Sequence, residues 1–294
     1  MRLPGFEPGL GAWGAEKGKI SLNWGDFRKW LYAKYSEEWA GKVFNYTKKY
    51  QGLLNGNLRE LESFSKSKKN NVLKSLIALS KYLGLYEQFK TRISNFGIKW
   101  EKQNSFESFL RIMNTKEGLT EWIKECIKVL DENKSTFIKF MTISGLRKGE
   151  AVKSFNRIIT LNQEGRLHEY YNPDLESLEH FRFEKDFIRG SKNVFFSFIP
   201  KGFINQITRC KPISYSALRK HLKKHNLKTR LNEIRDYYGT FMVHNGLIRE
   251  EVDLLQGRVG KSIFMRHYFS PSINNLRDRI LKAIQAMNTK ISTS

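Results

Sequence analysis

The sequence predicts a mainly α-helical protein of two domains, with a small antiparallel β-sheet in the second domain. Three observations support this fold class. Apolar residues recur at intervals of three and four through most of the 294 residues, which is the spacing of one helix face. An aromatic-rich stretch, 179–200, surrounds the turn-forming residues Gly190 and Asn193, as in a β-hairpin. The length favours two domains over one.

The composition describes a folded and strongly basic chain. Hydrophobic residues make up 40% and aromatic residues 13%, which is enough for a core and excludes a disordered tail. The formal net charge is +23, and basic residues recur in every segment. This excess favours a polyanionic partner, above all nucleic acid, over a charge that is spread without a role. A membrane surface is a weaker candidate, because the sequence has no long apolar run and no concentrated amphipathic anchor.

The two cysteines bear on the compartment and on metal binding. Cys126 and Cys210 are far apart and form no CxxC pair. The sequence therefore indicates neither a zinc site nor a disulfide framework, and it favours a reducing compartment. The first residues contain no hydrophobic signal core. We accordingly expect an intracellular protein without a metal site.

The first third of the chain is predicted to hold an irregular arm and a helical domain. Residues 1–18 are rich in glycine and proline, which interrupt any period and predict the arm. Residues 19–100 contain successive apolar stripes at helical spacing, the strongest over 72–83, with Gly84 as a stop signal. Lysines are interleaved with these stripes, and each is either a DNA contact or an ordinary solvated side chain. The candidates for DNA contact are Lys48, Lys49, Lys68 and Lys69.

The remainder is predicted to be a linker over 101–118, which is polar and poorly periodic, and a second domain over 119–294. Two helices are expected at the start of this domain, and the second is broken at Ser144-Gly145. Strands are expected over 157–161 and within 179–200. Further helices are expected over 214–225, 230–245, 250–255, 262–269 and 273–287. The last of these either packs on its own domain or docks onto a neighbouring copy.

Three arginines and one tyrosine in the second domain stand in short motifs that suit phosphate chemistry. Arg147 belongs to Ser-Gly-Leu-Arg-Lys-Gly-Glu, Arg235 to Asn-Glu-Ile-Arg, and Arg258 follows a glycine. Tyr268 lies ten residues after Arg258. A planar guanidinium holds two phosphate oxygens at once, and a tyrosine that attacks phosphorus conserves the bond energy as a phosphotyrosine. Each residue alone is commonly a surface ion pair or a packed aromatic, so the prediction depends on their joint order.

This joint order resembles the tyrosine recombinase, or phage-type integrase, family, and in particular its archaeal virus and plasmid branch. Arg147 matches the family's first arginine, and Glu150 matches the glutamate that orients it. Arg235 matches the arginine of the His-x-x-Arg box, and Tyr268 matches the nucleophile, with His267 beside it as a supporting residue. The resemblance covers the second domain well and the helical first domain more loosely.

Two positions depart from the family pattern. Asn232 stands where the box has its histidine, and Arg258 stands where many bacterial members have another histidine. Asparagine donates a hydrogen bond but cannot move a proton, and arginine cannot act as an acid near neutral pH. Archaeal virus-type integrases tend to replace these histidines. The resemblance implies a general acid on a β-hairpin, for which Lys192 is the first choice and Lys185 and Lys201 are the alternatives.

The resemblance implies a site-specific recombinase that needs no cofactor and no metal. The helical core-binding domain and the catalytic domain are expected to form a C-shaped clamp around double-stranded DNA. Four copies are expected to act as a homotetramer on two paired attachment sites, whereas the free protein can be a monomer. Residues 5–8, Gly-Phe-Glu-Pro, can be encoded by GGGTTCGAACCC, which is similar to the T-arm of a tRNA gene. We therefore expect an archaeal mobile element, a virus or a plasmid, whose attachment site matches a tRNA gene.

Two other functions stay open from the residues alone. The departures at Asn232 and Arg258 suggest a DNA-binding or architectural protein with a degenerate active site. An enzyme similar to type IB topoisomerases would share the chemistry and would need no second DNA site.

Overall fold

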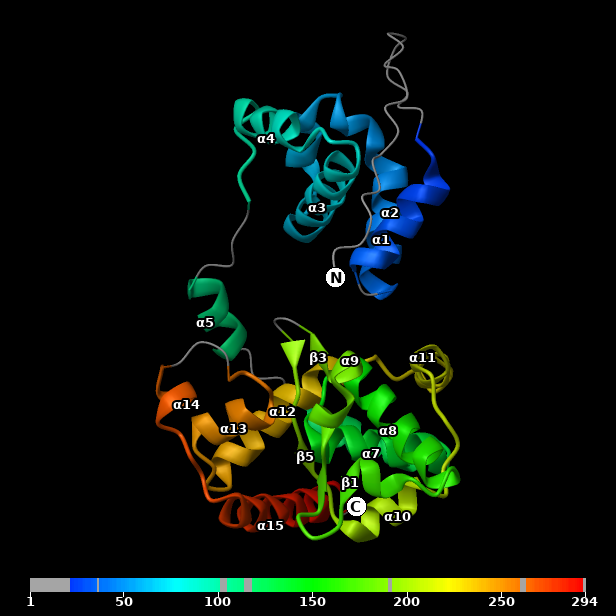
Figure 1. Ribbon diagram of the computed structural model, residues 1–294, viewed down its shortest axis with the longest axis vertical. Coiled ribbons are helices and arrows are strands. Elements are labelled where there is room, and N and C mark those ends of the chain that lie inside the picture. The colour runs from blue at the N-terminus through cyan, green and yellow to red at the C-terminus, as the bar shows by residue number, and fades with distance from the viewer. Residues whose placement is uncertain are drawn as a thin grey trace. The chain divides into compact units, whose positions relative to one another are not determined.

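The computed structural model describes residues 22–35, 37–100, 105–113, 118–189, 192–259 and 263–292. The chain divides into two compact units, residues 1–114 and 115–294, and each is described by itself (Figure 1). The predicted arm, residues 1–18, lies outside the described residues. A helix, α5 (Ser105–Met113), lies in the stretch predicted to be the linker. The domain limits given by the sequence stay predictions.

The described part of the first unit is helical. Its core is formed where α2 crosses α1 and α3, and side chains such as Phe27, Leu31 and Leu76 are fully buried there. Asn23 begins α1 by accepting hydrogen bonds from two backbone N–H groups of the first turn. Gly84 follows α3 with φ +71°, as the stop signal predicted. The helices are α1 (Trp24–Lys34), α2 (Glu37–Tyr50), η1 (Gln51–Leu54), η2 (Leu58–Ser63), α3 (Lys66–Tyr82), α4 (Tyr86–Asn95) and α5.

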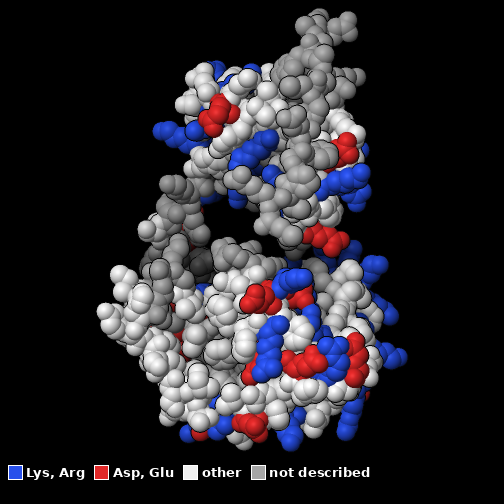
Figure 2. All heavy atoms as spheres, viewed as in Figure 1, with Lys and Arg blue, Asp and Glu red and all other residues white. Residues whose placement is uncertain are grey.

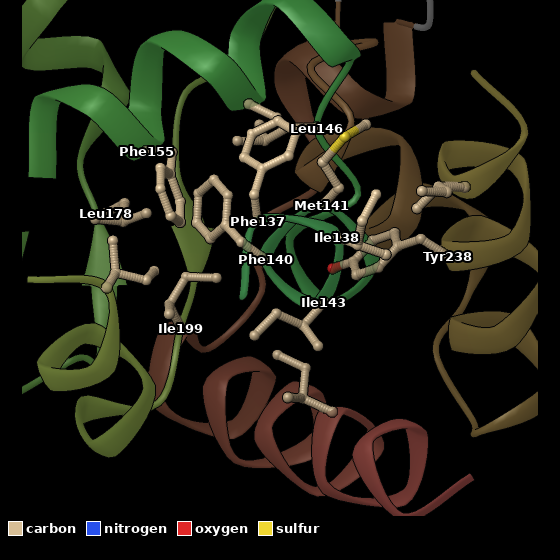
Figure 3. Packing of buried hydrophobic residues seen from close by; sticks show 14 of the residues in the cluster. Phe137, Ile138, Phe140, Met141, Ile143, Leu146, Phe155, Leu178, Ile199 and Tyr238 are labelled. Carbon is tan, nitrogen blue, oxygen red and sulfur yellow. The ribbon is translucent and has the colours of Figure 1, made fainter. Parts of the chain in front are cut away.

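The second unit surrounds a central helix, α7. Its residues Phe137, Ile138, Phe140 and Ile143 are completely buried, and such burial on all sides is expected of a helix inside a core. Figure 3 shows these side chains pointing toward α8, toward the sheet and toward α15. The helices of this unit are α6 (Leu119–Val129), α7 (Glu132–Ser144), α8 (Lys148–Gln163), η3 (Leu167–Glu169), η4 (His180–Phe183), α9 (Glu184–Phe187), α10 (Lys201–Ile207), α11 (Tyr215–Lys224), α12 (Leu231–His244), α13 (Arg249–Leu255), α14 (Ile263–His267) and α15 (Ile273–Ser292).

Two small antiparallel sheets lie beside these helices. Strands β1 (Tyr171–Asn172), β2 (Ser177–Leu178) and β5 (Ser197–Phe198) form one sheet in the order β1-β2-β5. Strands β3 (Ile188–Arg189) and β4 (Lys192–Asn193) form the hairpin. The predicted fold class, mainly helical with a small antiparallel sheet, is confirmed. No helix in the described ranges is both long and apolar enough to cross a membrane.

The strand prediction for 157–161 is wrong, because these residues belong to α8. Their β-branched side chains favour a strand locally. However, Phe155, Ile158 and Ile159 lie on one side of a helix, and all three are buried in the core. The prediction for 179–200 is correct at the hairpin and at β5, but η4 and α9 occupy the stretch between β2 and the hairpin. In both places tertiary burial overrides local strand propensity.

The C-terminal helix α15 packs on its own unit. Leu276, Ile280, Ile284 and Met287 are completely buried in the core of this unit. Arg279 also forms an ion pair with the buried Glu251 of α13. Of the two roles left open by the sequence, packing on its own domain is therefore the one that the structure shows.

Candidate active site

The turn between α7 and α8 places Arg147. Gly145 ends α7 with φ +60°, and a Cβ at this position would lie 2.3 Å from the ring of Tyr238. Only glycine fits this turn, which lets the chain reverse so that Arg147 directly precedes α8. The Arg147 backbone N–H and Nη1 both donate to the carboxylate of Glu150, over 3.1 and 2.8 Å. Glu150 is completely buried. Its carboxylate therefore holds both the backbone and the guanidinium of Arg147 from a fixed position.

Arg235 joins three segments of the second unit. Its guanidinium is buried, with 7% of the residue exposed. Nη1 donates to the Gly145 carbonyl over 2.8 Å, and Nη2 donates to the Gln256 carbonyl over 2.5 Å. The side chain of Gln256 donates in turn to the Arg235 carbonyl over 3.1 Å. Arg235 therefore ties α12 to the α7–α8 turn and to the end of α13.

Gly257 brings Arg258 against the β3–β4 hairpin. Gly257 has φ +65°, and a Cβ there would lie 1.9 Å from the carbonyl oxygen of Asn193. The same Asn193 oxygen accepts a hydrogen bond of 3.4 Å from Nη1 of Arg147. One carbonyl of the hairpin thus touches both the first arginine and the Gly257–Arg258 segment. Arg258 itself is half-exposed, and its Nη1 lies 3.4 Å from Asp253.

The charges of this arginine cluster, Arg147, Arg235 and Arg258, are not balanced. Burial, together with the positive charges of Arg147 and Arg258, lowers the pKa of Arg235 to about 10. Glu150 opposes this effect but does not cancel it. A buried cation next to two other cations is favoured when an anion binds between them. The arrangement therefore suits a phosphate, which arginines bind with two oxygens at once.

Asn232 and Lys192 lie beside the cluster. Asn232 precedes Arg235 by one turn of α12 and is exposed. Lys192 pairs with Arg189 in the hairpin and directly precedes Asn193, whose carbonyl contacts the cluster. The backbone of Lys192 is therefore next to the arginines, while its side chain lies outside the described residues. The alternative lysines, Lys185 and Lys201, lie in α9 and at the start of α10.

Tyr268 directly follows α14. Among the described residues, no hydrogen bond joins Tyr268 to the arginine cluster. It is 72% exposed, and its backbone N–H donates to the Phe264 carbonyl over 2.9 Å. The ring of His267 is 6.4 Å from that of Tyr268. Residues 260–262, which connect α14 to Arg258, lie outside the described residues. The structure thus assembles the three arginines with Glu150, and it places Tyr268 at an exposed position at the end of α14.

The lysines proposed to contact DNA lie at one end of α2 and at the start of α3. Lys48 and Lys49 are exposed in the last turn of α2, and Lys68 and Lys69 belong to the first turn of α3. The Lys68 ammonium lies 3.5 Å from the centre of the Phe64 ring, which is a cation–π contact. The aromatic ring positions this charge at the surface of the unit.

Gln256 was not identified from the sequence. It is almost fully buried, and it bonds Arg235 through both its backbone and its side chain. Its position directly before Gly257 was the only available signal, and a glutamine at a helix end does not by itself indicate this role. Across the described ranges, no group of three His, Cys, Asp or Glu side chains is placed to hold a metal ion.

The comparisons with known proteins concern the same part of the chain. A family model described as archaeal phage integrase matches residues 111–277, which is more than half of the chain. The matched segment contains the arginine cluster, the hairpin and Tyr268. No curated protein matches the chain.

Proposed function

Because the chain belongs to the archaeal phage integrase family and is therefore a DNA recombinase, we propose that it cuts and rejoins DNA through a covalent bond to Tyr268. The tyrosine oxygen attacks the phosphorus of a backbone phosphodiester, and the bond to the 5′-oxygen breaks. The products are a 3′-phosphotyrosine and a free 5′-hydroxyl. The tyrosine proton passes to solvent, and the leaving oxygen takes a proton from the general acid. The 5′-hydroxyl of another strand then reverses the step, rejoins the DNA and releases the tyrosine.

The observation that carries this proposal is the net positive charge of the arginine cluster, in which three guanidinium groups lie beside only two carboxylates of the described residues, those of Glu150 and Asp253. Arg147, Arg235 and Arg258 are proposed to hold the non-bridging oxygens of the phosphate, on which negative charge develops during the attack. Their fixed position supports this role, because Gly145, Glu150 and Gln256 hold two of the three guanidinium groups before DNA binds. Removing one such preorganised donor typically lowers a rate about 10²–10³-fold.

The roles of the remaining residues follow from their positions. Lys192 is proposed as the general acid, supported by the place of its backbone on the hairpin that touches Arg147. Asn232 is proposed to donate a hydrogen bond to the phosphate, and His267 to support the tyrosine. The exposure of Tyr268 leaves its hydroxyl accessible to a DNA strand.

We propose the wider assembly on the same basis. The first unit, with the surface of Lys48, Lys49, Lys68 and Lys69, is proposed to complete a clamp around double-stranded DNA inside the cell. Four copies are proposed to act on two attachment sites, without a metal or an organic cofactor. The attachment site is proposed to match the T-arm of a tRNA gene, as the codons available to residues 5–8 allow.

A covalent trap tests the proposed chemistry. The protein is incubated with labelled, nicked duplex DNA that carries the T-arm sequence, without metal, and is then separated on a denaturing gel. We expect a protein–DNA band from the wild type and from the control Tyr237→Phe, and no band from Tyr268→Phe. A band that persists in Tyr268→Phe would contradict the assignment. If a library of nicked sequences gives no band while DNA binding is intact, the protein binds DNA without cutting it.

A further inference from the structure

A shallow depression lies next to the arginine cluster, and of the residues that line it only Asn232 has a role in the chemistry proposed above. It is formed by the first residues of α8 and α12, by one side of α11 and by the loop before α12. The residues that line it are Lys148, Tyr215, Arg219, Thr229, Leu231 and Asn232. Two carry a positive charge, three carry a neutral hydroxyl or amide group, and no carboxylate lines the depression. Such a lining suits an anion.

The walls of the depression are fixed by packing. Leu218 and Leu222 bury the inner side of α11, which leaves Arg219 exposed on its outer side. The indole of Trp122 donates to the Lys228 carbonyl over 2.9 Å and so anchors the loop that carries Thr229. These contacts fix α11 and the loop before α12 on the rest of the unit.

Arg219 and Lys148 supply the charge. The Lys148 ammonium lies 4.4 Å from the centre of the Tyr215 ring, which holds it at the wall of the depression. Arg219 forms no ion pair with the residues that the structure describes. Figure 2 shows lysine and arginine atoms gathered along the margin of the second unit where Figure 1 places α11. Three helices also begin here, and the positive ends of their dipoles add to the potential.

Two residues that line the depression are close in sequence to arginines of the cluster. Lys148 directly follows Arg147, and Asn232 precedes Arg235 by three residues on α12. Three residues of a helix span about 4.5 Å. Successive phosphates of one DNA strand rise by about 3.4 Å along the helix axis and lie farther apart than that through space, so a site one helical turn away from the cluster is within range of a neighbouring phosphate.

We infer that this depression binds the DNA phosphate next to the one that is cut, with Arg219 and Lys148 as its cations. The inference rests on the proposed function, because it takes the arginine cluster as the site of the cut phosphate. Arg219 is a positioning residue: it helps to hold the strand beside the cut phosphate and takes no part in bond breaking. Its charge therefore contributes to DNA affinity and to the salt dependence of binding.

The salt dependence of DNA binding tests the inference, with Lys220 as the matched control. Lys220 is the next residue of α11, is also exposed and does not line the depression. Binding of labelled T-arm duplex is measured by fluorescence anisotropy over a series of sodium chloride concentrations, for Arg219→Gln and Lys220→Gln in the Tyr268→Phe background. Each neutralised phosphate contributes a slope of about −0.9 to the plot of log K against log salt. We expect Arg219→Gln to lose about this amount and Lys220→Gln to keep the full slope. Equal slopes in the two variants would overturn the inference.

Two further measurements separate this inference from neighbouring possibilities. Covalent trapping by Arg219→Gln with the tyrosine intact is expected to reach the wild-type level at saturating DNA. Loss of the adduct at saturation would instead place Arg219 in the chemistry. Inorganic pyrophosphate is then titrated into the wild type and into Arg219→Gln. Pyrophosphate binding that needs Arg219, together with an unchanged DNA slope, would assign the depression to small phosphates and overturn the inference. If no adduct forms in any variant, the proposed function fails, while the slopes still report on the depression.

Discussion

The arginine cluster and α14 belong to the same unit but are built in opposite ways. In the cluster, Arg235 is buried, and its guanidinium bonds two backbone carbonyls from segments far away in the sequence. Helix α14 has five residues, and Ile263 and Phe264 on it are 70% and 49% exposed. The proposed nucleophile, Tyr268, directly follows this short helix and is exposed as well.

This difference indicates how the proposed reaction is divided between the two regions. Charge stabilisation is most effective when the donors are fixed before the substrate arrives, and the cluster meets this condition. A segment with few buried apolar contacts has low local stability and can be repositioned at small cost. Substitutions in the cluster should therefore affect folding and chemistry together, whereas substitutions in α14 should affect chemistry alone.

The largest effect is expected for Arg235→Lys. One ammonium group cannot reach both the Gly145 and the Gln256 carbonyls, so a buried acceptor is left without its donor, which costs about 1–3 kcal/mol. The phosphate also loses a two-oxygen contact, and we expect covalent adduct formation to slow by about 10²–10³-fold. Urea unfolding and the rate of the covalent trap measure the two effects. Arg209→Lys, on an exposed arginine of the same unit, is the control and should change neither.

A comparison of Gly257→Ala with Gly165→Ala should separate the cost of a steric clash from the cost of backbone strain. The new Cβ would meet the Asn193 carbonyl at 1.9 Å, and backbone atoms cannot move aside as a flexible side chain can. Gly165→Ala is the matched control, because Gly165 has a similar φ of +70° and no atom within 4 Å of its Cβ position. We expect Gly257→Ala to be less stable than Gly165→Ala by about 1–3 kcal/mol, and to cleave DNA more slowly because the hairpin moves. Equal stability would mean that the hairpin does not pack on Gly257.

The sequence predicts the parts of this cluster but not how they meet. Local motifs and apolar spacing predict the order of Arg147, Arg235, Arg258 and Tyr268, and they predict the helices in or beside which the arginines lie. The contacts of the Gly145 carbonyl with Arg235 and of Gly257 with the Asn193 carbonyl could not, because each joins segments that are far apart in the sequence. A glycine in a sequence does not disclose which atom would collide with its missing side chain. The strand predicted at 157–161 failed for the same reason, since burial and not local propensity decided its conformation.

A smaller effect is expected for the ion pair between Arg279 of α15 and Glu251 of α13, the helix that ends beside Gln256. Burial raises the pKa of Glu251, but hydrogen bonds from Arg279 and from the Ile248 N–H, with the charge of Arg279, lower it below its usual value overall. A carboxylate whose pKa is lowered on folding stabilises the protein above its unfolded pKa, and this contribution is lost as the pH falls through the folded pKa. Arg279→Met should therefore cost about 1 kcal/mol at neutral pH and progressively less in acid. Unfolding free energies at several pH values measure this, and a cost that is independent of pH would assign it to packing.

The smallest effect is expected in α14, and it is the sharpest test of the comparison. Ile263→Ser and Phe264→Ser remove exposed apolar groups, so the free energy of unfolding should change by no more than about 0.5 kcal/mol. Ile234→Ser, on the buried side of α12, is the contrast and should cost several times more. Backbone amides of α14 should also exchange with deuterium faster than those of α12, because local opening precedes exchange in weakly packed segments.

A loss of more than 1 kcal/mol in the α14 variants, with slow exchange, would show that α14 is packed in solution. The tyrosine would then be fixed before DNA binds, and the reaction would need no movement of α14.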